Sequence, residues 1–394
     1  MMPASPERKS GRSRASALLR RFVVWGTKGF GRIPGQAGRS FDAGAQPREQ
    51  WSVARFGIRG RRGRIGLLVA LTACAAMLVM AALLLAMRPE APADTPTAPS
   101  ADTPVWQLRK YREIGYVHSY KLDLIRELPA PPKLMTIGGS RTTRFEPDLM
   151  RRLTGLPTMN CSVHNCQPED VWAFASDLRS RAPNVKLRLL WGIGVGGMRD
   201  NTFAQGLVYD PRLARWFPPE LIDEQKTLIG EPVIKNLLAI NRFTPRGMLK
   251  YTNYDRQRER GLTLDASLDK WIPTHVSKEM QTSERSTARA RAYFEKTMAL
   301  FNEQGVTPCI VMMPYQPRAF RALSAVPQWK TSFEEFRAYL KDMRATYDFR
   351  LLDYTQVGSF GGRDDEFFDG AHVTVENSRL LLRKAVQQAP ECFD

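Results

Sequence analysis

A run of 23 uncharged, mostly apolar residues, 65–87, constrains this chain more than any other feature of its sequence. A helix of this length, at about 1.5 Å rise per residue, spans the roughly 30 Å hydrocarbon core of a bilayer. Arginines crowd the N-terminal side of the run from Arg59 to Arg64, whereas Arg88 is soon followed by acidic residues. The positive-inside rule therefore predicts one transmembrane helix, with residues 1–64 in the cytoplasm and everything after Arg88 outside.

A cleaved signal peptide is the alternative reading of the same run. The tripeptide Ala91-Pro92-Ala93 loosely resembles a small-residue cleavage site. However, the apolar run is longer than the usual core of a signal peptide, and the segment before it is far too long for the charged start of one. An anchored protein is therefore the favoured prediction.

The charge of the chain is concentrated before the apolar run. Residues 1–64 contain 15 Lys and Arg against 3 Asp and Glu, so they carry +12 of the formal net charge of +18. A basic tail beside a membrane segment predicts a disordered cytoplasmic segment that contacts anionic lipid headgroups, and no nucleic-acid partner is expected. Residues 88–105 include five prolines and are predicted to be an extended stalk.

The remaining residues, 106–394, are predicted to form one extracytoplasmic α/β domain. Short apolar runs alternate with helical patterns, which is typical of a mostly parallel sheet covered on both faces, in a three-layer α/β/α arrangement. An insertion is expected around 192–282, where glycines and prolines interrupt the rhythm. The predicted strands are 133–137, 158–161, 186–191, 307–313 and 350–354, and the predicted helices are 147–153, 168–181, 283–304, 332–346 and 376–387.

The first predicted strand leads into the string Ile137-Gly138-Gly139-Ser140. Glycines let the chain turn tightly, so that a serine just after them is exposed and its own backbone N–H can face a developing oxyanion. The same string is also compatible with a strand that ends in an ordinary turn. Alone, it does not distinguish a nucleophile from a loop serine.

A second motif, Asp369-Gly370-Ala371-His372, stands just before the last predicted helix. An acid three residues before a histidine can reach its imidazole, fix its tautomer and stabilise the imidazolium that forms when the ring accepts a proton. Asp and His are also common in turns and helix caps. The combination of a serine after the first strand with this motif before the last helix is more specific than either part.

This combination resembles the SGNH/GDSL hydrolase superfamily, and in particular its envelope-anchored members of the DltD-like and alginate O-acetyltransferase-like groups. The resemblance extends over about residues 130–390. It implies that Ser140 is the nucleophile, that His372 is the general base and later the acid, and that Asp369 orients His372.

Two further blocks of the superfamily pattern are altered in this chain. Residues 160–170 are similar to an Asn-x-Ser-Val-x-Gly-Gly-x-Pro-Glu-Asp pattern, with Asn165 where the family has its oxyanion-hole glycine. An asparagine tolerates positive φ and still offers its backbone N–H, although its side chain could narrow the acyl pocket. Residues 194–201 match a Gly-x-Asn-Asp block poorly, which leaves Asn201 as a weaker oxyanion candidate beside Ser140 and Asn165.

Several other side chains are candidate substrate-binding residues. Arg141 and Arg144 flank the candidate nucleophile and could bind an anionic group or form salt bridges at a helix start, and His164 could line the pocket. His118 and His275 have no companion motif and are predicted to be surface or internally hydrogen-bonded histidines. The aromatic candidates for a sugar-stacking platform or for core packing are Trp172, Trp191, Trp216, Trp271, Tyr251 and Tyr254.

The cysteines and histidines do not predict a metal site. The four histidines of the chain show no paired ligand spacing with its cysteines, so neither zinc nor an organic cofactor is expected. Cys161 and Cys166 could form a disulfide or remain thiols in an oxidising compartment. Cys309 lies in an apolar strand pattern and is predicted to be a buried thiol.

Together these features predict a membrane-anchored serine esterase or O-acyltransferase that acts on ester-linked acyl groups of a cell-envelope glycan or glycolipid. Its expected partners are membrane lipid, the acylated glycan or glycolipid, and a membrane-bound O-acyltransferase. The alternative is a catalytically degenerate relative that binds polysaccharide or scaffolds an envelope polymer-export complex.

Overall fold

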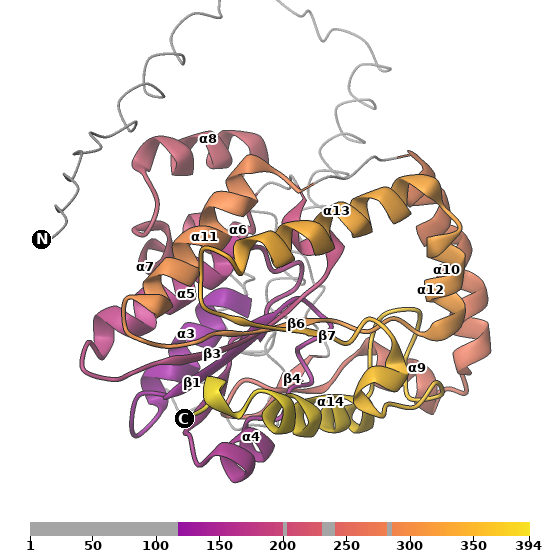
Figure 1. Cartoon of the computed structure of the whole chain (residues 1–394), viewed down its shortest axis with the longest axis horizontal. Helices are drawn as coiled ribbons and strands as arrows, with labels where there is room; N and C mark the ends of the chain where they lie inside the picture. Colours follow the sequence, from indigo (N-terminus) through magenta and orange to yellow (C-terminus); the bar gives the residue numbers. More distant parts are fainter. Residues whose placement is uncertain (1–116, 200–202, 231–240, 282–285) are drawn as a thin grey trace, which may run out of the picture. The chain divides into compact units, whose positions relative to one another are not determined.

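The computed structural model describes residues 117–199, 203–230, 241–281 and 286–394 (Figure 1). The predicted cytoplasmic tail, transmembrane helix and stalk lie outside the described residues, as does Asn201. Among the helices that the structure does describe, none has the length and apolar character needed to cross a bilayer.

The centre of the domain is a sheet of five parallel strands in the order β2-β1-β3-β6-β7. The prediction of an α/β fold with a parallel sheet is therefore confirmed. The strands are β1 (Leu134–Gly138), β2 (Thr158–Asn160), β3 (Arg188–Ile193), β6 (Cys309–Met312) and β7 (Arg350–Asp353).

Twelve α-helices are described, and helices cover both faces of this sheet. Seven of the twelve lie outside the insertion. They are α3 (Val117–Glu127), α4 (Pro147–Thr154), α5 (Pro168–Arg181), α11 (Ala288–Asn302), α12 (Pro317–Ser324), α13 (Pro327–Met343) and α14 (Val375–Gln388). Short 3₁₀ helices occur at η2 (Val195–Met198), η4 (Val357–Phe360) and η5 (Pro390–Cys392).

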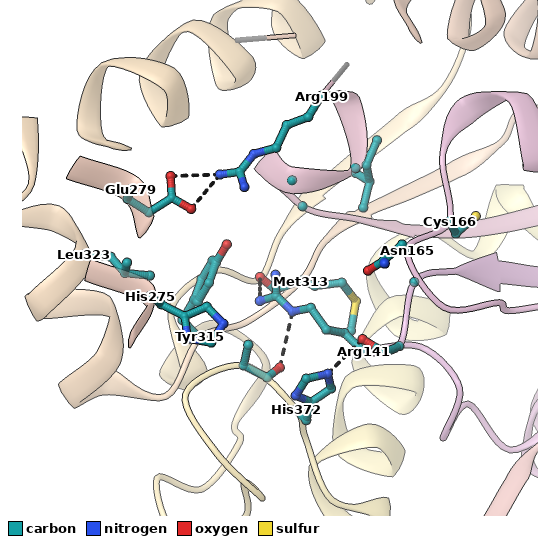
Figure 2. Close-up of a pocket in the computed structure, with 18 of the residues that line it drawn as sticks. Arg141, Asn165, Cys166, Arg199, His275, Glu279, Met313, Tyr315, Leu323 and His372 are labelled. Carbon is teal, nitrogen blue, oxygen red and sulfur yellow. Dashed lines mark hydrogen bonds and ion pairs between the residues drawn. The ribbon is translucent and has the colours of Figure 1, made fainter. Parts of the chain in front are cut away.

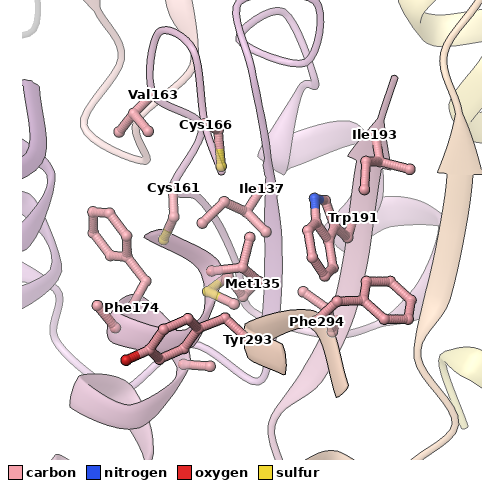
Figure 3. Close-up of a cluster of buried hydrophobic side chains, with 14 of the residues drawn as sticks. Met135, Ile137, Cys161, Val163, Cys166, Phe174, Trp191, Ile193, Tyr293 and Phe294 are labelled. Carbon is pink, nitrogen blue, oxygen red and sulfur yellow. The ribbon is translucent and has the colours of Figure 1, made fainter. Parts of the chain in front are cut away.

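Alternation along the strands divides the core into two layers. In β3, Trp191 and its neighbours two residues away face one cluster, which α5 and α11 cover, whereas Leu190 faces a second cluster, which α4 and α14 cover. Figure 3 shows the first cluster, in which the Trp191 ring lies 5.3 Å from that of Phe294 on α11. Side chains of a strand point to opposite faces in turn, so a strand buried on both faces must be apolar throughout.

The predicted elements of the sheet are confirmed with strand boundaries that differ by one or two residues. Helix α5 begins at Pro168 and ends at Arg181 as predicted, because Asp170 accepts a hydrogen bond from the Gln167 N–H at 2.7 Å and closes a capping box. Helix α13 begins earlier than predicted, at Pro327, a residue suited to a first helical turn. Helices α3 and α12 were not predicted.

The insertion between β3 and α11 is more regular than the sequence suggested. Its described part is mostly helical, with one small antiparallel β-pair. The elements are α6 (Gln205–Tyr209), α7 (Pro211–Ala214), α8 (Pro219–Ile229), α9 (Asn253–Glu259), α10 (Leu264–Gln281), β4 (Arg242–Phe243) and β5 (Leu249–Tyr251).

The described cysteines are all free and buried. Cys161 and Cys166 therefore do not form the disulfide that the sequence left open. Both lie in the apolar cluster of Figure 3, where burial raises the pKa of the Cys161 thiol to about 12. Cys309 is a buried thiol in β6, as predicted.

Candidate active site

The candidate site lies at the carboxyl edge of the parallel sheet. The strand order changes direction between β1 and β3: β2 lies beyond β1 on one side, and β6 and β7 lie beyond β3 on the other. Ligands of such parallel sheets bind beyond the carboxyl ends of the strands at that point. Ser140 follows β1, Asn165 follows β2 and Gly194 follows β3. The fold thus collects at one edge segments that are far apart in the sequence.

The turn after β1 depends on Gly138. Its φ is +154°, and a Cβ added there would lie 2.2 Å from the carbonyl oxygen of Gly192 in β3. Only glycine permits this close approach of two neighbouring strand ends. Thr142 then closes the turn, since its N–H and its hydroxyl donate to the Gly139 carbonyl at 3.0 and 2.8 Å.

Asn160, at the end of β2, supports the same turn from within the core. Its side-chain amide donates to the carbonyls of Phe145 at 2.9 Å and Thr142 at 3.1 Å, and its side-chain oxygen accepts from the Ser162 N–H at 2.9 Å. The Asn160 carbonyl in turn accepts from the buried ammonium of Lys121 at 2.8 Å. In the sequence, Asn160 stands out only as the first residue of the block 160–170 that resembles the family pattern, and this supporting role was not predicted.

The Asp369–His372 motif forms a tight turn closed by a bridge between Phe367 and Val373. One Asp369 carboxylate oxygen accepts from the backbone N–H groups of Ala371 at 2.8 Å and His372 at 2.9 Å. The His372 Nδ1 lies 2.8 and 2.9 Å from the two carboxylate oxygens. The backbone hydrogen bonds within the turn therefore hold the Asp369 carboxylate in place, and the carboxylate in turn orients the His372 ring.

Ser140 and His372 meet although 232 positions separate them in the sequence, with Ser140 Oγ 2.8 Å from His372 Nε2. A carboxylate can only accept, so Nδ1 carries the proton that it donates to Asp369, and Nε2 is left to accept from the Ser140 hydroxyl. The three residues singled out from the sequence thus form a continuous Ser–His–Asp hydrogen-bond chain.

The charge of Asp369 is maintained inside the protein. Burial of this carboxyl group opposes its ionisation, but the charge of His372 and the hydrogen bonds from His372 and Ala371 outweigh that cost and lower the pKa to about 2. Asp369 therefore remains a carboxylate at neutral pH. A group must carry this negative charge to stabilise an imidazolium.

Arg141 has a positioning contact as well as a place in the pocket. Its guanidinium donates to the Ala371 carbonyl at 3.2 Å, to the Met313 carbonyl at 2.9 Å and to the Pro314 carbonyl, and it lies 4.1 Å from the centre of the Tyr315 ring. It thereby ties the turn that carries His372 to the loop after β6. These hydrogen bonds go to backbone carbonyls and are not the salt bridges that were the predicted alternative. Arg141 also lines the pocket, so its substrate-binding role stays a prediction.

The substrate-binding prediction is wrong for Arg144, and for His164 it stays a prediction. Arg144 is buried away from the pocket, where it pairs with Asp255 and donates to the Lys250 carbonyl at 2.9 Å, because the helix start after β1 turns it toward the insertion. His164 is exposed and is not among the pocket-lining residues, but partial desolvation by the surrounding chain and, after it, the charge of the nearby His372 ring lower its pKa.

Asn165 has the positive φ expected at a former glycine position, +52°, and lines the pocket beside Ser140. Within the described part of the chain, the backbone N–H groups of Ser140 and Asn165 donate to no backbone or side-chain acceptor. Both are candidate oxyanion donors. The third candidate, Asn201, lies outside the described residues.

Ser140 lines a pocket of about 340 Å³. Figure 2 shows this pocket around the labelled His372, Asn165 and Arg141. Helix α10 of the insertion supplies Trp271, His275, Lys278 and Glu279 to its lining. Across the pocket, one guanidinium nitrogen of Arg199 contacts both Glu279 oxygens at 2.7 and 2.9 Å, which links α10 to the loop after β3.

The contribution of α10 to the lining of this pocket was not predicted from the sequence. Trp271 was named as a possible stacking residue, but His275 was assigned no role beyond an internal hydrogen bond. The two rings stack at 3.7 Å with an angle of 11°, and the His275 Nδ1 lies 2.8 Å from the Trp271 carbonyl. Their i, i+4 spacing is the only signal in the sequence that places them together on one helix face. The prediction for His118 is confirmed, since it bonds to Asp170 at 2.9 Å.

Comparisons with protein-family models and with curated proteins found no match to this chain. Within the described residues, no group of three or more His, Cys, Asp or Glu side chains is arranged to hold a metal ion. The candidate site is therefore defined by its own geometry.

Proposed function

We propose that this domain is an SGNH-like serine hydrolase or O-acyltransferase that cleaves or transfers an ester-linked acyl group. The observation that carries the proposal is the 2.8 Å contact between Ser140 Oγ and His372 Nε2, continued by the bond from Nδ1 to Asp369. The parallel sheet with helices on both faces also supports the three-layer α/β/α architecture of that superfamily.

In the first half of the proposed reaction, Ser140 Oγ attacks the acyl carbonyl carbon while His372 Nε2 takes the hydroxyl proton. The carbonyl oxygen becomes an oxyanion, which the backbone N–H groups of Ser140 and Asn165 would stabilise. Collapse of the intermediate breaks the ester bond, and the imidazolium returns its proton to the departing alkoxide. An acyl group on Ser140 remains.

In the second half, water or a sugar hydroxyl attacks the acyl-serine, with His372 again as the base. The acceptor depends on how far the insertion keeps water out of the pocket. The aromatic and charged lining from α10 suits a polar, ring-containing acceptor better than a purely apolar one.

The proposed setting follows from the N-terminal sequence. A single membrane anchor with the domain on the extracytoplasmic side would place the pocket near envelope glycans and acylated glycolipids, and beside a membrane-bound O-acyltransferase that could supply acyl groups. These substrates and partners are part of the proposal.

The test uses the full-length protein, purified in mild detergent, with a fluorophosphonate probe and a simple acetyl ester. We expect the probe to label Ser140 and the ester to be hydrolysed, and Ser140→Ala to abolish both. Ser359→Ala is the matched control, because Ser359 is exposed and its hydroxyl donates only to the Gln356 carbonyl nearby. A folded wild-type protein that is neither labelled nor active would favour the non-catalytic, polysaccharide-binding alternative.

A further inference from the structure

A fourth side chain, Tyr254, contacts the Ser–His–Asp chain. It comes from the first turn of α9, in the insertion, and its ring lies 4.9 Å from the His372 ring at an angle of 35°. Its hydroxyl oxygen is 3.2 Å from His372 Nδ1. The Tyr254 ring also stacks on Phe368 at 5.6 Å, so that Tyr254 covers one side of the turn that carries Asp369.

Helix α9 is held in this place by the same residues that hold the nucleophile turn. Thr252 caps the helix and accepts from the Tyr254 N–H at 3.0 Å, and Asp255 accepts from the Thr252 N–H at 2.7 Å. Asp255 also pairs with the buried Arg144, four residues after Ser140. The position of Tyr254 is thus tied to both the serine and the histidine segments, which gives Arg144 a clear structural role.

The proton positions around Nδ1 define what the hydroxyl can do. Nδ1 carries a proton and donates it to Asp369, so the Tyr254 oxygen can only be a second acceptor for that proton. The Tyr254 hydroxyl proton is then directed to the Asp369 carboxylate. Burial and the neighbouring charge and hydrogen bond of Asp369 raise the pKa of Tyr254, which keeps the phenol protonated.

We propose that Tyr254 is a positioning residue that holds the Asp369–His372 pair in its reactive geometry and supports the imidazolium through its hydroxyl oxygen. The role in reactivity rests on the proposed function of the site. The hydrogen-bond contact between the Tyr254 hydroxyl and His372 Nδ1 is independent of that function, because it involves only the proton on Nδ1.

The other titratable groups near His372 occupy different positions around the ring. Asp369 lies on its own turn, His275 comes from α10, and His164 comes from the loop after β2. Of the side chains in the described part of the chain, only those of Asp369 and Tyr254 hydrogen-bond to Nδ1. Replacing the Tyr254 hydroxyl therefore tests this contact separately.

The experiment compares full-length wild-type protein with Tyr254→Phe, which removes the hydroxyl and keeps the ring. The rate of fluorophosphonate labelling is measured from pH 4.5 to 9. With one hydrogen bond to the imidazolium lost, we expect labelling at the plateau to slow by roughly fivefold and the acidic limb of the profile to move to lower pH by about half a unit. Tyr251→Phe is the matched control. Tyr251 was a candidate stacking residue in the sequence, but it is not among the pocket-lining residues, and its hydroxyl donates to Glu259 at 2.7 Å.

A second measurement does not depend on activity. The Nδ1 proton resonance of His372, assigned with a His372→Gln variant, is expected to shift in Tyr254→Phe and to remain unchanged in Tyr251→Phe. If wild type is not labelled, the proposed function fails and this resonance alone decides the role of Tyr254. If Tyr254→Phe does not fold, 3-fluorotyrosine at position 254 keeps the packing and should still shift the resonance. An unchanged resonance together with an unchanged labelling profile would overturn the inference.

Discussion

Gly370 offers a sharp test of whether the insertion determines the geometry of the turn that carries Asp369 and His372. A Cβ at this position would lie 2.3, 2.5 and 2.6 Å from three atoms of the Trp271 ring, whereas unstrained carbon contacts lie near 3.5 Å, so Gly370→Ala requires a shift of about 1 Å. Any movement of that ring also disturbs its stack with His275. Overpacking of this kind costs about 2 kcal/mol, which corresponds to a fall of about 5 °C in the melting temperature.

The same shift should appear in the reactivity of the site. Gly370 lies between Asp369 and His372, so displacing the turn should lower the rate of Ser140 labelling by ten- to roughly a hundredfold. Gly358→Ala is the control, because a Cβ there meets nothing within 4 Å and its φ is not positive. That variant should be unchanged, or more stable by about 0.5 kcal/mol, through a smaller entropy loss on folding.

A double-mutant cycle with Trp271→Ala separates steric conflict from other effects of Gly370→Ala. If the ring is the obstacle, Gly370→Ala should cost almost nothing in the Trp271→Ala background, with a coupling free energy of about 2 kcal/mol. Additive effects in thermal unfolding, or a Gly370→Ala variant that behaves like Gly358→Ala, would refute this account of the contact between α10 and the turn.

Two further predictions concern the pH dependence of folding. Asp369 has a folded pKa of about 2, below the ordinary value of 3.8, so it should contribute about 2 kcal/mol of stability above pH 4 that is lost as the pH falls toward 2. Urea unfolding of Asp369→Asn should lack this component, and an identical acid dependence in the two proteins would contradict it. Burial lowers the pKa of the Lys121 ammonium to about 7. Between pH 7 and 9 the Lys121 side chain is therefore protonated in the unfolded state but largely neutral in the folded state. The free energy of unfolding of the wild type should then rise by up to about 1.4 kcal/mol per pH unit over this range. Lys121→Met should flatten this rise in unfolding experiments at pH 7, 8 and 9, and an equally steep rise in the variant would contradict the assignment to Lys121.

The elements of the sheet were accessible from the sequence because their signals are local. A strand buried on both faces, such as β3, must be a short apolar run. The start of a helix such as α5 is indicated in the sequence by Pro168 and by the capping residues beside it. The Asp369-x-x-His372 motif is also local, since three residues suffice to bring the carboxylate to the ring. Helices α3 and α12 were not predicted, although α12 carries local start signals of the same kind. Pro317 lies in its first turn, and the Gln316 side chain accepts from the Arg318 N–H at 2.6 Å.

The roles of the arginines, tyrosines and tryptophans around the site were not accessible in this way. Arg141 and Arg144 look equivalent in the sequence. However, Arg141 donates to carbonyls beside the turn that carries His372, whereas Arg144 pairs with a carboxylate 111 positions away. Tyr254 and Trp271 belong to an insertion whose docking on the turn is decided by contacts across more than 90 residues of chain.

By itself, the sequence determined the apolar segment before the domain, the alternation of strands and helices that indicates a parallel sheet, and the identity of the Ser, Asp and His residues. Only the tertiary structure decided that Ser140 and His372 meet, that helix α10 of the insertion lines the pocket, and which polar groups face the pocket. The physical reason is that strand and turn patterns arise from the properties of consecutive residues, whereas a pocket arises from segments whose mutual positions depend on the packing of the whole core.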